Sequence, residues 1–197
     1  MTRQFDLCGG HLALDFANTV SGLQTGSPIE RIPAYPELVA FAHQTGVVTA
    51  GQAASLLGRG RRDPEAAAGA HGRAVALRDA LYRLFAAVAR RADPALDDLE
   101  TLDRELGRLC IGADLSIAWR DPPDTADGFV GAIVHAAVLL LTAPAERDRV
   151  RLCEAPDCQW LFYDSSRNRS RRWCDMRQCG NRMKARRHYA RARERAG

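Results

Sequence analysis

Apolar side chains recur every three or four positions along most of the first 145 residues. This spacing places them on one face of a helix, the face that packs against a core. The longest stripe includes Leu77, Leu81, Leu84 and Val88. The pattern predicts helices over residues 34–46, over 49–58 with Thr49 as N-cap, over 64–91, from a start at Asp93-Pro94 to Leu109, and from about Thr125 to Thr142.

Strict alternation of apolar and polar residues is confined to short segments. It predicts a strand over residues 113–121 and a second over 149–154. Residues 5–20 are ambiguous, because their apolar residues alternate while three of their polar residues share a helical face. We therefore predict a mainly α-helical fold with a few short strands.

The last quarter of the chain carries a different pattern, two pairs of cysteines with equal spacing. Four residues separate Cys153 from Cys158 and Cys174 from Cys179, and fifteen lie between the pairs. Four thiolates in two pairs suit tetrahedral zinc, whose structural sites are closed by four soft ligands. We predict that these four cysteines bind one structural Zn²⁺.

Other uses of the cysteines fit the sequence less well. A redox dithiol usually occurs as CxxC near a βαβ pattern, and disulfides need an exported chain. A catalytic zinc would keep one position open. His188 is a further candidate ligand in place of one cysteine, although it follows Cys179 by nine residues.

The residues around the cysteines predict the local fold. The segment QWLFYDSSRNRSRRW, between the pairs, is predicted to form a β-hairpin in which Trp160, Phe162 and Trp173 cover the metal. The segment after the second pair lacks proline and is rich in Ala and Arg, which predicts a helix. A turn, a hairpin and a helix that supplies the last ligands make a small treble-clef-like zinc finger.

Charge divides the chain at about the same place. Its 197 residues carry a net charge of +4, but residues 151–197 hold 13 Lys and Arg against 5 Asp and Glu, a net +8, which leaves −4 for residues 1–150. A basic end on an acidic body is typical of a segment that binds a polyanion. We predict a helical N-terminal domain at 1–150 and the zinc finger at 151–197.

Several cations of the finger are candidates for nucleic-acid contacts, most of them to phosphates. They are Arg167, Arg169, Arg171, Arg172, Arg182, Lys184, Arg186, Arg187 and Arg191. RNA stays open as the partner, because Trp160, Tyr163 and Tyr189 could stack on unpaired bases. An acidic protein partner and a merely solvated basic helix also stay open.

The N-terminal segment holds a second group of candidate residues. His11, Asp15, Asn18 and Thr19 interrupt an apolar stretch and could line a ligand pocket, or serve as caps and buried hydrogen-bond hubs. Cys8 and Cys110 lie far from the finger in sequence and are predicted to be small buried apolar groups.

Some classes of protein are disfavoured. The N-terminus does not resemble a signal peptide, and the longest apolar stretch, residues 131–143, is too short to span a bilayer. The motifs GxSxG, HExxH, GxGxxG and the Walker loop are absent. We predict a cytoplasmic protein that is not an enzyme and does not enter a membrane.

Two motifs resemble a known family. Trp173 before the second cysteine pair and the tetrapeptide Cys179-Gly180-Asn181-Arg182 resemble the CGNR zinc finger. The segment LALDFANT at 12–19 resembles the opening of the ABATE domain, found in bacterial proteins described as stress-induced transcription regulators. Ala13 and Ala17 are smaller than the residues often found at these positions in the family.

The resemblance implies a transcription regulator that binds double-stranded DNA through its zinc finger. It also implies a mainly helical N-terminal domain that senses a small-molecule effector. The alternative is an RNA-associated or protein-interaction zinc module. Homo-oligomerisation is compatible with either.

Overall fold

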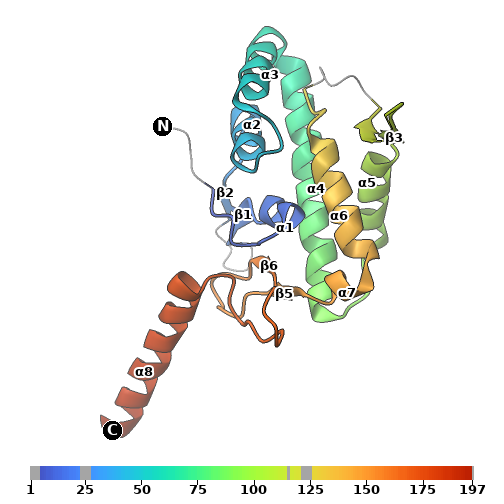
Figure 1. Cartoon of the computed structure of the whole chain (residues 1–197). Helices are drawn as coiled ribbons and strands as arrows, with labels where there is room; N and C mark the ends of the chain where they lie inside the picture. Colours follow the sequence, from blue (N-terminus) through green and yellow to red (C-terminus); the bar gives the residue numbers. More distant parts are fainter. Residues whose placement is uncertain (1–4, 23–27, 115, 121–125, 197) are drawn as a thin grey trace.

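The long helix α4 forms the centre of the molecule, and helices α1, α2, α3, α5 and α6 pack around it (Figure 1). The computed structural model describes residues 5–22, 28–114, 116–120 and 126–196. Its helices are α1 Leu12–Ala17, α2 Tyr35–Gln44, α3 Ala50–Arg62, α4 Pro64–Arg90, α5 Leu96–Leu106, α6 Val130–Thr142, α7 Pro144–Arg147 and α8 Asn181–Ala196. Its strands pair antiparallel as β1 Val20–Ser21 with β2 Ile29–Glu30, β3 Leu109–Ile111 with β4 Ile117–Trp119, and β5 Val150–Leu152 with β6 Leu161–Tyr163. The prediction of a mainly α-helical fold with a few short strands is confirmed.

Helix α4 follows the predicted apolar stripe closely. Leu77, Leu81 and Leu84 are buried in the main core. The helix begins after Asp63, whose carboxylate accepts a hydrogen bond from the backbone N–H of Ala66. It ends at Arg90, because the following residue, Arg91, has a left-handed φ of 56° that stops the helical hydrogen-bond pattern.

The other helices agree with the prediction except at some ends. Thr49 caps α3, as predicted, and forms a reciprocal capping box with Gln52. Helix α5 begins at Leu96 without a side-chain cap, so the prediction that Asp93-Pro94 caps and starts it was wrong. Leu109 belongs to β3 instead of α5, because the chain leaves the helix at Gly107.

The ambiguous segment 5–20 forms helix α1 and then enters β1. Its periodicity was unclear because α1 is buried on almost every side, between α4, α6 and β6. Ala13, Leu14, Phe16 and Ala17 are all completely inaccessible to solvent. A helix surrounded by protein has no solvent-exposed polar face to reveal its period.

Strands β5 and β6 connect the body of the molecule to its C-terminal part. Both strands pack against α4, and β6 also packs against α1. Val150 and Leu161 lie in the main core, whereas Phe162 lies in a second, smaller core with the cysteines. The predicted boundary between residues 150 and 151 thus falls inside β5, and it stays a prediction.

Helix α6 is the most apolar of the described helices, yet it covers only 13 residues. In the part of the chain that the structure describes, no helix combines the length and apolar character needed to cross a bilayer.

Candidate metal centre and nucleic-acid interface

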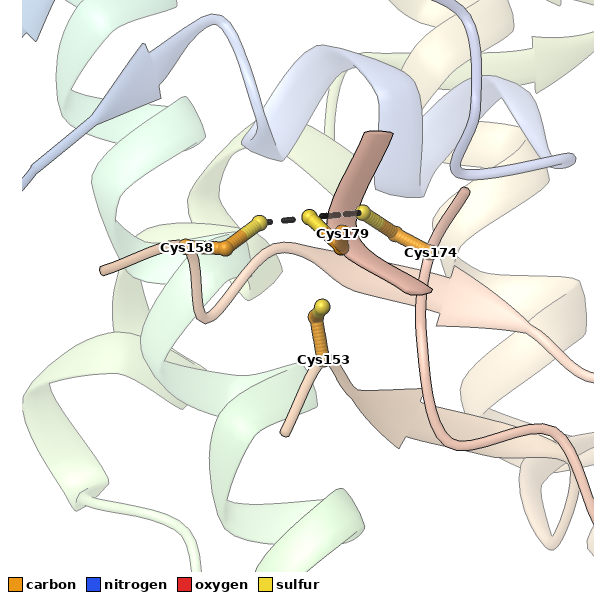
Figure 2. A group of neighbouring side chains, drawn as sticks. All are labelled: Cys153, Cys158, Cys174 and Cys179. Carbon is orange, nitrogen blue, oxygen red and sulfur yellow. Dashed lines mark hydrogen bonds between the residues drawn. The ribbon is translucent and has the colours of Figure 1, made fainter. Parts of the chain in front are cut away.

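The four cysteines of the two pairs converge on one point (Figure 2). Their sulfur atoms all lie within 4.8 Å of one another. Sγ of Cys174 lies 3.6 Å from that of Cys158 and 3.8 Å from that of Cys179. Ligands at about 2.3 Å from a tetrahedral metal are separated by about 3.8 Å. These distances are also far longer than a disulfide bond of about 2.05 Å.

Local backbone structure places each sulfur. Cys153 follows β5 directly, and its N–H donates to the carbonyl of Trp160 across the turn at 2.8 Å. Cys158 closes that turn by donating its N–H to the carbonyl of Ala155. Cys179 lies in a short π-helical turn, Met176–Gly180, immediately before α8. A helix after the second cysteine pair was predicted, and α8 is that helix. The prediction that its start supplies the last ligands was wrong, because Cys174 lies in the loop and Cys179 in the turn that precedes α8.

The hairpin of the finger differs from the predicted one. Strand β6 pairs with β5, with Leu152 opposite Leu161, so the hairpin turn contains the first cysteine pair. Residues 164–173 form a loop instead of a second strand. The buried carboxylate of Asp164 accepts hydrogen bonds from the backbone N–H groups of Ser166 and Arg171. These bonds give the two N–H groups a partner in the absence of a second strand.

Electrostatics at the cluster favour a bound cation. Hydrogen bonds from the thiols of Cys158 and Cys174 lower the pKa of Cys153, and backbone N–H groups act in the same direction. Hydrogen bonds with the thiols of Cys153, Cys158 and Cys8 raise the pKa of Cys174, because they stabilise its protonated form. Four thiolates in one small volume would repel one another, and a bound positive ion removes that repulsion.

The donor set fits a structural metal ion of the zinc type. Four sulfur donors fill a tetrahedral site and leave no position for water or substrate. Trp160 and Phe162 are buried in the core that encloses the cysteines, and Trp173 packs against it, as predicted. Arg182 adds an outer contact, since its Nη2 lies 3.4 Å from Sγ of Cys179.

The arginines and the lysine predicted to bind nucleic acid divide into two groups. The first group pairs with other residues of the same chain. Arg171 donates to the carbonyl of Cys174 at 2.7 Å, and Arg172 pairs with Glu154 at 2.5 Å.

Two further arginines of this group share one partner. Arg182 and Arg186, one turn apart on α8, both pair with Asp157 at 3.1 Å. These contacts hold the start of α8 against the first cysteine turn.

The second group is presented to solvent. Arg167 and Arg169 are exposed in the loop, and Lys184 and Arg187 are exposed on α8. Helix α8 extends away from the rest of the molecule (Figure 1). Arg191 lies on α8 beyond the residues whose side chains the structure describes.

The candidate pocket residues of the N-terminal segment all make hydrogen bonds that hold the fold. His11 caps α1 by accepting from the N–H of Ala13, and the hydroxyl of Thr19 donates to the carbonyl of Phe16. Asp15 and Asn18 are buried. A ligand pocket at these residues stays a prediction; their described contacts are those of caps and hydrogen-bond hubs.

Asn18 connects the two parts of the chain. Its Nδ2 donates to the carbonyl of Leu161 at 2.8 Å, and its Oδ1 accepts from the N–H of Leu161 at 2.9 Å. Asn18 is 2% exposed, so both bonds are shielded from water. The amide replaces a strand partner for the outer edge of β6.

The buried carboxylate of Asp15 is expected to make the stability of the protein depend on pH. Burial raises its pKa to about 6, although it accepts from the N–H of Gly9. The native state therefore retains a proton that the unfolded chain loses near pH 4, so this group makes stability fall as the pH rises from about 4 to 6. We expect Asp15→Asn to remove this decline and to stabilise the protein at pH 7 by about 2 kcal/mol. Urea unfolding between pH 4 and 8 measures it; an unchanged slope in the variant would contradict the assignment.

The sequence did not indicate a groove lined by charged residues at the junction of α3 and α4. Its volume is about 930 Å³, and its lining includes Arg59, Arg73, Arg108 and Asp127. The buried carboxylate of Asp127 accepts from Arg73 at 2.7 Å and from Arg108 at 3.1 Å. Only the packing of distant elements brings these charges together.

Cys8 was predicted to be a small buried apolar group. It is only half-buried and packs against the cysteine cluster, 145 positions before Cys153 in the chain. The prediction of full burial was therefore wrong for this residue, and its distance from the finger in sequence gave no sign of this contact. Cys110 is likewise only half-buried, in β3.

Family models match both parts of the chain. The model of the CGNR zinc finger matches residues 149–192. The model of the ABATE family, which carries the description "putative stress-induced transcription regulator", matches residues 10–144 and so covers more than half of the chain. A search of curated proteins found no match.

Proposed function

Because the chain belongs to the ABATE family and carries a CGNR zinc finger, we propose that it is a transcription regulator that binds double-stranded DNA through this finger. The observation that carries the proposal is the exposed basic helix α8, which begins directly after the last cysteine of the cluster and extends away from the body (Figure 1). We place its action in the cytoplasm, where cysteines stay reduced and able to bind metal. Its proposed role is binding, without catalysis.

The metal is proposed to be one structural Zn²⁺, held by Cys153, Cys158, Cys174 and Cys179. Sulfur separations of 3.6 and 3.8 Å support this choice, because they match a tetrahedral zinc–thiolate site. When bound, the ion supplies no reaction. It stabilises the turn and the start of α8 in one arrangement.

The proposed DNA surface combines α8 with the loop before it. Lys184 and Arg187 lie three positions apart and so share one side of the helix. Arg187 also lies over the ring of Trp173, 5.7 Å from its centroid, which orients the guanidinium. Arg167 and Arg169 add positive charge from the loop. The charges paired with Asp157 would act mainly by orienting the helix.

Fluorescence anisotropy on a mixed-sequence duplex, over a series of salt concentrations, tests this surface. We expect Lys184→Ala combined with Arg187→Ala to weaken binding and to reduce the slope of log affinity against log salt by up to about two, because two phosphate contacts are lost. Arg61→Ala with Arg62→Ala, an equal loss of charge on α3, is the matched control.

Two outcomes would reject the proposed surface. If both double variants changed the slope equally, the contact would not lie on α8. If single-stranded RNA bound more tightly than the duplex, the alternative of an RNA-associated module would replace the DNA proposal.

Control by a small molecule is proposed to act through the groove above Asp127. A ligand with an anionic group could compete with Asp127 for Arg73 and Arg108. Such a ligand would loosen the link that Asp127 makes between Arg73 of α4 and Arg108, the residue before β3. The proposed effector is thus a small molecule with an anionic group. Changes in the melting temperature of the protein on addition of such molecules test this proposal.

A further inference from the structure

A fifth thiol lies beside the four cysteines of the finger, and it comes from the other end of the chain. Cys8 packs against the core that contains the cluster and lies close enough to Cys174 for the two thiols to interact. Cys8 lies outside the motifs that resemble the CGNR zinc finger. It is therefore a thiol beside a set of four ligands that is already complete.

The position of Cys8 is held by bonds on both sides. The following residue, Gly9, donates its N–H to Asp15 at 2.8 Å and accepts from the N–H of Tyr163 in β6 at 2.8 Å. Phe5, three residues earlier, exchanges two backbone hydrogen bonds with the side chain of Gln44, at 2.7 and 2.6 Å. The segment that carries Cys8 is therefore attached to both the body and the finger.

Gly9 itself is required for this attachment. A Cβ atom at this position would lie 2.7 Å from Oδ1 of Asp15 and 3.0 Å from its backbone nitrogen. The turn can approach α1 closely only because residue 9 has no side chain. This close approach is what delivers Cys8 to the cluster.

Exposure separates Cys8 from three of the four ligands. Cys153 is 2% exposed and Cys174 and Cys179 are each 4% exposed, whereas Cys8 and Cys158 are half-buried. A bound metal would share the sulfur electron pairs of Cys158 and the other three ligands, but not those of Cys8. A small oxidant would thus oxidise the uncoordinated sulfur of Cys8 before the other four.

We propose that Cys8 is an oxidation site that forms a disulfide with Cys174 on exposure to a hydroperoxide. The sulfur of Cys8 attacks the peroxide, the O–O bond breaks, and Cys8 becomes a sulfenic acid with release of water or an alcohol. The thiolate of Cys174 then attacks the sulfur of Cys8. The S–O bond breaks, and the hydroxide takes a proton to leave as water. Two thiols are oxidised and one peroxide is reduced.

The disulfide removes one of the four metal ligands. It leaves three cysteines at the site and links the N-terminal segment covalently to the loop before α8. This inference rests on the proposed zinc finger, but the disulfide itself forms from this chain's own residues. Oxidation would therefore weaken both metal binding and the arrangement of α8.

The test uses the full chain loaded with zinc and treated with a few equivalents of hydrogen peroxide. Digestion without reductant and mass spectrometry identify the disulfide, while a chromogenic chelator follows zinc release. We expect a peptide linking Cys8 to Cys174, with zinc release slowed about tenfold in Cys8→Ser, since only metal-coordinated sulfurs then remain at the site. Cys110→Ser, which removes another half-buried cysteine, should behave like the unaltered protein.

Several outcomes would overturn the inference. These are disulfides confined to the four finger cysteines, equal zinc release in Cys8→Ser and the unaltered protein, or a loss of zinc from Cys8→Ser before oxidation. Cys8→Ala serves as a second variant, and melting before treatment checks that each is folded. Absence of zinc from the untreated protein would instead reject the zinc proposal, while the disulfide measurement would still decide the role of Cys8.

Discussion

Replacing Cys153 by serine is expected to abolish zinc binding and to destabilise the body of the protein as well as the finger. Cys153 follows β5 without an intervening residue, and β5 packs against α4. Val150, at the start of the same strand, is completely buried in the main core. Loss of the metal therefore releases a strand that the body uses for packing.

The expected size of this effect follows from the energy of structural zinc sites. Zinc binding in such sites contributes about 10–16 kcal/mol at pH 7, most of it available only to the folded state. Loss of even a third of this would lower the melting temperature by about 10 °C or more in a chain of this size. Circular dichroism would also record the loss of helical signal from α8.

Metal analysis and thermal unfolding together measure the result. Cys110→Ser is the control, because it removes a cysteine from β3, in a different hairpin. Chelation of the metal from the unaltered protein should reproduce the fall in melting temperature. This second measurement does not depend on whether Cys153→Ser folds. An undiminished zinc content in Cys153→Ser would reject the four-cysteine site.

The features that sequence predicted well are those encoded by neighbouring residues. The stripe of Leu77, Leu81 and Leu84 predicts α4 because a helix brings residues three and four apart onto one face. The spacing of the cysteine pairs likewise predicts the cluster, because each pair shares one short turn. Neither inference needs knowledge of a distant contact.

The features that sequence missed depend on contacts between distant segments. Strand β6 could have paired with the residues after it, and only the fold shows that it pairs with β5. Cys8 resembled an isolated cysteine because the chain returns to it only after 145 positions. The groove at Asp127 combines α3 and α4 with Arg108, just before β3, in the same way. Local periodicity contains no information about such pairings.

Asn18 is the residue whose role depends most on this long-range packing, and its replacement should have the second largest effect. Asn18→Ala would leave the N–H and the carbonyl of Leu161 without their side-chain partner in a buried setting. Each buried polar group without a partner costs about 1–3 kcal/mol. We expect the free energy of unfolding to fall by about 2–4 kcal/mol.

The effect should also reach the finger, since Leu161 opens the strand that carries Phe162 into the cysteine core. Urea unfolding measures the stability, and the rate of zinc loss to a chelator measures the finger. Asn168→Ala, at an exposed position in the loop before the second cysteine pair, is the matched control and should change neither.

Asn18→Asp separates the two bonds. It keeps an acceptor for the N–H of Leu161 but places a carboxylate oxygen against the carbonyl, where an N–H donor is needed. It should therefore destabilise at least as much as alanine at pH 7. A loss of stability in Asn18→Ala without faster zinc loss would show that the body and the finger unfold independently, which would contradict the coupling through β6.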